Sequence, residues 1–145
     1  MTARSAAVSC LALATAALVV SPAVPRAEGL PKALSCKFEK GTSIAYAEGA
    51  YEPTAAQPLA IDIGDINLDE QLAVLETGKG QGALRIVRAV NANHFLEVVN
   101  EGFLNLTTIY DEDQKRKAFP AVHSRHVGLL GEPVVAQYYG FCTAK

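Results

Sequence analysis

The segment AFPAVHSRHVG, Ala118 to Gly128, holds the densest group of side chains that could carry out chemistry. Two histidines, a serine and an arginine occupy consecutive positions, His123-Ser124-Arg125-His126. Such a group could bind a metal ion, supply a nucleophile and its base, or bind an anion. The outcome depends on whether the segment is a strand or a helix, because this decides which side chains share a face.

The sequence favours a strand for this segment. Strand geometry argues against a metal site and against a nucleophile paired with its base. Pro120 on one side and Gly128 on the other disfavour a helix. On a strand, positions three apart point to opposite faces, so His123 and His126 could not share one metal ion. The adjacent Ser124 and His123 also point to opposite faces, which excludes a direct hydrogen bond between a nucleophile and its base.

The same spacing favours an anion-binding pair. His123 and Arg125 are two positions apart, so they share a face at a distance of about 7 Å, and both can donate hydrogen bonds to an anion. Arg85 on an earlier strand could join them. We therefore predict His123, Arg125 and Arg85 as ligand-binding residues, with no catalytic residue and no metal or other cofactor. In the alternative, Arg125 pairs with a surface carboxylate, Glu97 or Glu132, and His123 is merely solvated.

A second hypothesis makes the protein a small hydrolase or a metal-dependent enzyme. It uses His94, Glu97, His123 and His126, and it requires these four side chains to converge. The chain contains no G-x-S-x-G motif. The sequence therefore favours binding over catalysis.

The rest of the chain is predicted to form short strands. SCKFEK, PLAIDIGDI, ALRIVRAV and HFLEVV alternate with the period of two that is typical of half-buried strands. TSIAYAEGAYEP is interrupted by Glu-Gly, which indicates a hairpin, and in FLNLTTIYD the residues Leu104, Leu106 and Tyr110 share one face. About eight such strands at intervals of about ten residues predict an all-β fold, a small antiparallel barrel or sandwich.

The N-terminal segment, residues 1–27, is predicted to be a secretory signal peptide. A short positive start is followed by an uncharged apolar run and by small residues, with cleavage after Ala23 or Ala27. The run is shorter than the roughly 20 residues that span a bilayer, so no stable membrane anchor is expected after cleavage; an uncleaved anchor is the alternative. Residues 28–145 are then a single β domain, located in the periplasm or secreted.

Cleavage would leave two cysteines, Cys36 and Cys142, near the two ends of the mature chain. An even number of cysteines in an exported chain indicates a disulfide bond. A bridge over about 100 residues stabilises by roughly 4–5 kcal/mol in the chain-entropy model. It would join the first and last strands, which suits a sheet that closes on itself. Two free buried thiols are the alternative.

The charge balance limits the class of partner. Cleavage after Ala27 removes Arg4 and Arg26 from 13 basic residues and leaves 11, against 15 acidic residues, a net charge of −4. A nucleic-acid-binding protein would carry a basic stripe instead. We therefore expect a protein or a small molecule as the partner.

The segment from Ala83 to Cys142, which includes LRIVRAVNANHFLEV and EGFLNLTTIYDEDQKRKAFPAVHSRHVG, resembles a group of small exported alphaproteobacterial proteins with no assigned activity. The resemblance extends to LSCKFEKG at Leu34 to Gly41. It implies a periplasmic or secreted location and carries over no catalytic residue.

In architecture alone, the chain is similar to the periplasmic inhibitors of C-type lysozyme. These are small antiparallel barrels with a cysteine near each end. Their inhibitory loop, a serine-rich stretch that runs into Ala-Arg-Tyr, is missing from this sequence. The likeness therefore implies only a shape. The regular strand pattern, the single long-range bridge and the lack of an assembled catalytic set predict a non-enzymatic binding or inhibitor-type module.

Overall fold

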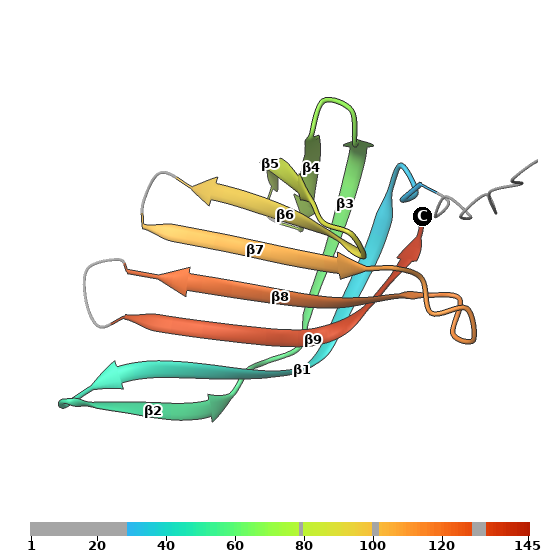
Figure 1. Ribbon diagram of the computed structural model, residues 1–145. Coiled ribbons are helices and arrows are strands. Elements are labelled where there is room, and N and C mark those ends of the chain that lie inside the picture. Colours follow the sequence, from blue (N-terminus) through green and yellow to red (C-terminus); the bar gives the residue numbers. More distant parts are fainter. Residues whose placement is uncertain (1–28, 79, 100–101, 129–132) are drawn as a thin grey trace, which may run out of the picture.

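The computed structural model describes residues 29–78, 80–99, 102–128 and 133–145, and these fold into antiparallel strands (Figure 1). The predicted signal peptide lies outside the described residues. Among the described residues, no helix is long and apolar enough to cross a membrane. The strands are β1 (Leu34–Ala47), β2 (Ala50–Ala55), β3 (Leu59–Asn67), β4 (Leu72–Thr77), β5 (Gly80–Arg88), β6 (Ala92–Val99), β7 (Phe103–Tyr110), β8 (Phe119–Val127) and β9 (Val134–Ala144).

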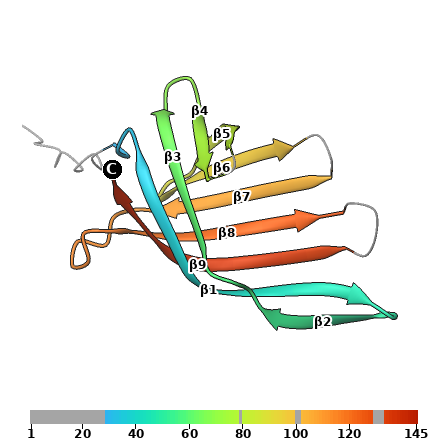
Figure 2. The same ribbon diagram turned by 180° about the vertical axis from the view of Figure 1, so that it is seen from behind.

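Eight of these strands form a closed barrel. β1 and β3 to β9 pair in chain order, and β9 pairs back onto β1, while β2 is an extra strand beside β1. The all-β prediction is confirmed, and of the two predicted architectures the barrel is the one observed. Closure brings the C-terminus beside the start of β1, where the Lys145 N–H donates to the Ala33 carbonyl oxygen at 3.1 Å (Figures 1 and 2).

β1 is one long bent strand. Its first part, Leu34 to Phe38, pairs with β3, and its second part, Thr42 to Ala47, pairs with β2. Its opposite edge pairs with β9, with a register shift between Phe38 and Lys40. Such a bulge bends a strand without ending its pairing. For this reason SCKFEK and TSIAYA, which look like two strands in the sequence, belong to one.

The β1–β2 hairpin is present as predicted and extends away from the barrel (Figure 2). Glu48 and Gly49 have φ values of 51° and 86°, as the favoured two-residue hairpin turn requires. Tyr46 and Tyr51 face each other next to this turn, with ring centroids 5.0 Å apart. The outer edge of β2, which contains Pro53, pairs with no other described strand. A proline removes one donor from such an edge and hinders further pairing.

The apolar core surrounds the predicted disulfide bond. Cys36 and Cys142 lie directly opposite each other on β1 and β9, both are fully buried, and they are bonded. The two strands approach so closely here that a Cβ atom on Gly140 would collide with the carbonyl oxygen of Lys37. The buried cluster consists of Leu34, Cys36, Phe38, Ile61, Ile63, Ile66, Ala73, Leu75, Leu84, Ile86, Phe95, Ile109, Ala121 and Cys142.

Candidate functional site

His123 and Arg125 both point into the barrel from β8. His123 is buried and Arg125 is half-buried, and both line an interior cavity together with Leu59 of β3 and Leu75 of β4. The two side chains share one face of the strand, as their spacing predicts. What the sequence does not indicate is that this face is the inner one.

The His123 ring is held in an apolar and aromatic environment. Its Nδ1 lies 2.8 Å from Oγ1 of the buried Thr107. Its centroid lies 5.7 Å from the Phe38 ring and 5.8 Å from the Tyr138 ring. Burial, and secondarily the positive charge of Arg125, lower the pKa of His123 to about 4. The imidazole is therefore neutral at pH 7, and the interpretation of His123 as a solvated surface residue is wrong.

The second ring nitrogen of His123 is accessible from the cavity. No buried side-chain nitrogen or oxygen of the described residues lacks a hydrogen-bond partner. Within the described chain the ring makes one hydrogen bond, through Nδ1, and Nε2 has no partner. Because no buried polar side-chain atom there lacks a partner, Nε2 is not buried and is open to the cavity that the ring lines. A neutral imidazole has one donor and one acceptor nitrogen, so it can contribute one polar contact to an occupant.

A chain of hydrogen bonds crosses three neighbouring strands beside His123. Asn105 of β7 lies directly opposite both Glu97 of β6 and Arg125 of β8. Its Nδ2 donates to Glu97 Oε2 at 2.6 Å, and its Oδ1 accepts from Arg125 Nε at 3.4 Å. One amide therefore bridges a carboxylate and a guanidinium group on the inner wall.

Arg125 does not pair with Glu97, one of the two carboxylates that the sequence offered as alternative partners. In the part of the chain that the structure describes, every ion pair involves Lys145, which contacts Asp62 at 2.7 Å and Glu76 at 3.5 Å. Glu97 is separated from Arg125 by the Asn105 amide, and Glu132 lies outside the described residues. Within the described ranges only Nε of Arg125 makes a side-chain hydrogen bond, so its terminal nitrogens have no partner there.

The cavity is lined by both apolar and polar side chains. Its volume is about 230 Å³, and it is partly open to solvent. Gly82 of β5 makes room for the acidic side chain, because a Cβ atom there would collide with Glu97 Oε1. The apolar lining residues are Leu59, Ile61, Leu75 and Phe103, and the polar lining residues are Thr77, Glu97, Asn105, His123 and Arg125.

A larger hollow of about 640 Å³ lies at the opposite end of the barrel, beside the β5–β6 and β7–β8 connections. Charged side chains of both signs line it, including Arg88, Asp111, Glu112 and Lys117. It contains neither of the two residues that the sequence analysis placed together on β8.

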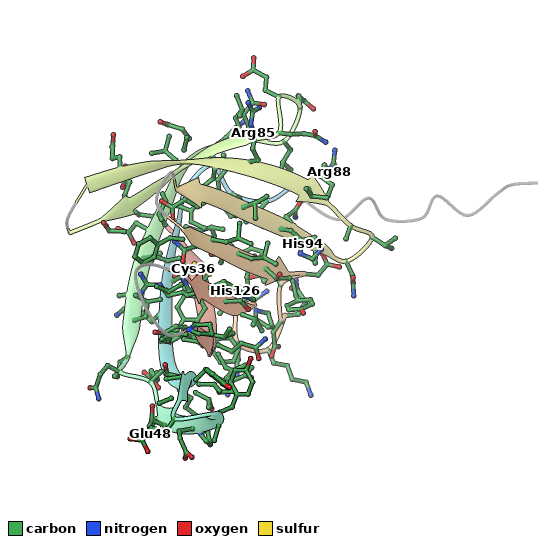
Figure 3. The ribbon with its side chains drawn as sticks, turned by 90° about the vertical axis from the view of Figure 1, so that its left-hand side faces the viewer. Cys36, Glu48, Arg85, Arg88, His94 and His126 are labelled. Carbon is green, nitrogen blue, oxygen red and sulfur yellow. A yellow bond between two sulfur atoms is a disulfide. The ribbon has the colours of Figure 1, made fainter. Side chains whose placement is uncertain are left out.

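Arg85 does not join the other two predicted ligand-binding residues. It is exposed on the outer face of β5, where it pairs with Leu72 on one side and Leu96 on the other. Its neighbours Leu84 and Ile86 are the buried residues of this strand. Figure 3 shows Arg85 at the edge of the molecule remote from the hairpin turn at Glu48. Arg85 therefore does not line the cavity with His123 and Arg125, because β5 directs it outward.

The four residues of the enzymatic hypothesis do not converge. Glu97 and His123 line the cavity, whereas the exposed His126 is three positions from His123 and points outward. His94 is also on the outer face, with Nδ1 2.9 Å from Thr108 Oγ1 (Figure 3). Within the described ranges, no three histidine, cysteine, aspartate or glutamate residues form a group that could hold a metal ion.

Sequence reasoning missed Asn105 and Thr107, the β7 members of the site. The alternation in FLNLTTIYD places Leu104 and Leu106 together, and an apolar face is ordinarily the inner one. In the structure Leu104 is 39% exposed and Thr107 only 3%, so the polar set points inward. The pairing register with β8, which the sequence does not specify, would have identified both residues.

Comparisons of the chain with protein-family models, with curated proteins and with solved structures found no match. The site is therefore interpreted from its own geometry. That geometry is a small cavity with an apolar wall, facing a neutral histidine, a carboxylate and a guanidinium group with free donors.

Proposed function

We propose that the protein is an exported, non-enzymatic binding module whose ligand occupies the cavity beside His123 and Arg125. The observation that carries this proposal is the Glu97–Asn105–Arg125 chain on the inner wall of a barrel end, beside the apolar lining of Leu59, Ile61, Leu75 and Phe103. Charged groups beside an apolar core destabilise a fold unless a partner satisfies them. A few polar groups that converge on a mostly apolar cavity are the usual composition of a ligand site.

The position of Thr107 supports binding in preference to hydrolysis. Its hydroxyl is the only one in hydrogen-bond contact with His123 among the described residues, and a nucleophile would need such a contact. Thr107 is buried, however, and does not line the cavity. A ligand in the cavity would meet the imidazole and the guanidinium group, not this hydroxyl.

The predicted signal peptide, the disulfide bond and the resemblance to exported proteins together support an extracytoplasmic location. Disulfide bonds persist in oxidising compartments such as the periplasm and the extracellular space. The bond between Cys36 and Cys142 is compatible with either of these.

Native mass spectrometry of protein purified from the cells that produce it tests the proposal. We expect the wild type to retain a small molecule that is lost on denaturation. Leu59→Trp, which fills the cavity from a half-buried position, should abolish retention. Leu104→Trp, which places the same side chain on the outer face, should retain the compound. A compound that survives in the Leu59→Trp variant would show that the cavity is not its site.

A further inference from the structure

The interior site presents two opposite charges that do not neutralise each other. Glu97 and Arg125 line the same cavity, yet no nitrogen–oxygen contact within 4.0 Å joins them. Two side chains of opposite charge in one small site would ordinarily approach and pair, because their attraction strengthens as water is excluded. Something must therefore hold them apart.

The strand register and Asn105 provide this separation. The three residues lie in one row across β6, β7 and β8, with Asn105 in the middle. The outer two backbones are then two strand spacings apart, about 9–10 Å. The amide engages both partners, accepting from Arg125 and donating to Glu97. Each charged group keeps part of its hydrogen-bonding capacity for an occupant of the cavity.

The remaining wall specifies an apolar body for this occupant. Leu59 and Ile61 on β3 and Leu75 on β4 line the cavity from the side of the barrel opposite the polar row, and Phe103 lies beside Asn105 on β7. The volume of about 230 Å³ is below the range of about 300–1,000 Å³ that is typical of sites for drug-sized ligands. A short branched aliphatic chain or a single ring has the corresponding size.

We propose that the site binds a small zwitterion with an apolar body, an apolar α-amino acid being the simplest case. Its carboxylate lies on Arg125, its ammonium group on Glu97, and its side chain against the leucine and phenylalanine wall. This inference rests on the proposed binding function and specifies its ligand class. A simple apolar carboxylate would satisfy Arg125 but would leave Glu97 as a repulsive neighbour. A simple apolar amine would have the converse defect.

The neutral state of His123 is consistent with this charge pattern. A protonated imidazole beside Arg125 would add a second positive charge and favour a dianion. Because burial and the Arg125 charge keep the pKa of His123 at about 4, the cavity wall has one cation and one anion at pH 7. His123 then contributes a neutral contact through Nε2.

Isothermal titration calorimetry on the purified, oxidised protein tests the inference with four probes. L-leucine carries both charges and an apolar body, isocaproate lacks the ammonium group, isoamylamine lacks the carboxylate, and L-serine lacks the apolar body. We expect L-leucine to bind about tenfold to a hundredfold more tightly than isocaproate or isoamylamine, the range expected for losing one hydrogen-bonded charge contact. We expect a preference of about the same size over L-serine, which loses the burial of the apolar body.

Two variants assign the charges to residues. Glu97→Gln preserves the shape of the side chain and an acceptor for Asn105 but removes the negative charge. The affinity for L-leucine should therefore fall to that for isocaproate. Gly82→Ala should also lower the affinity for L-leucine, because the added Cβ displaces the Glu97 carboxylate. Gly78→Ala, which meets no atom within 4 Å, is the matched control and should bind as the wild type does.

The outcomes separate this inference from the proposed function. If isocaproate binds as tightly as L-leucine in both the wild type and Glu97→Gln, the inference of a zwitterionic ligand is overturned. The protein would then be a carboxylate-binding module. If none of the probes binds and native mass spectrometry identifies a ligand of other chemistry, the inference is likewise overturned while the binding function holds. If no ligand is retained either, both fail.

Discussion

Replacing His123 by glutamine is expected to make the barrel less sensitive to acid. The folded protein holds this histidine at a pKa of about 4, against 6.5 for an exposed imidazole. As the pH falls below 6.5, the unfolded chain takes up a proton that the folded chain does not. The free energy of unfolding therefore decreases between these two pKa values, and this contribution becomes constant below about pH 4.

The magnitude follows from the two pKa values. By proton linkage, His123 lowers the free energy of unfolding by about 2 kcal/mol at pH 5 and about 3 kcal/mol at pH 4, relative to pH 7.5. Glutamine does not titrate and can still form a hydrogen bond with Thr107. Carboxylates titrate in both proteins, so their contribution cancels in the difference. The charged groups on the same inner wall, Arg125 and Glu97, are present in both proteins as well.

Urea unfolding followed by far-ultraviolet circular dichroism at pH 7.5, 5 and 4 measures the effect. The quantity of interest is the difference in pH dependence between wild type and His123→Gln, because the substitution also changes the stability at neutral pH. His126→Gln, at an exposed position on the same strand, is the control and should follow the wild type. If the wild type and His123→Gln lose stability in parallel, His123 is not held neutral by burial.

Three further predictions concern the fold. Replacing Cys36 and Cys142 together by serine should lower the free energy of unfolding by about 4–5 kcal/mol in the chain-entropy model, measured by chemical denaturation; an unchanged value would show that β1–β9 pairing alone closes the barrel. Gly140→Ala should destabilise by about 1–3 kcal/mol or more through its collision with the Lys37 carbonyl oxygen, measured as a lower midpoint of urea unfolding. Gly78→Ala is its control, and equal midpoints would contradict the close approach of β1 and β9. Pro53→Val should increase self-association in sedimentation experiments, since it restores a donor to the free edge of β2; a variant as monomeric as the wild type would show that this proline does not protect the edge.

The strands could be predicted from the sequence because alternation is a local property. Phe95 and Glu97 are placed on one face by the pattern of HFLEVV, and both are on the inner wall. The pairing of His123 with Arg125 on one face follows from the same rule. The outward position of Arg85 also follows from its alternation with the buried Leu84. The prediction that Arg85 joins His123 and Arg125 is inconsistent with this pattern.

The choice of the inner face on β7 and β8 could not be predicted. On β8, one face carries Ala121, His123 and Arg125, and the other Val122 and Ser124, so hydrophobicity does not distinguish them. The barrel turns the histidine face inward because its ring fits between aromatic neighbours and a buried threonine. These are contacts between distant parts of the chain, and no local pattern encodes them.

The direct pairing of β1 with β9 has a consequence for the order of folding. The two cysteines are separated by 106 positions, so the pairing that closes the barrel must wait until β9 has emerged from the ribosome. Until then β1 and β8 each expose an open edge, and intermediates with such edges are prone to aggregate. Because the disulfide bond spans the same pair of strands, the loss of free thiols during refolding reports when the barrel closes.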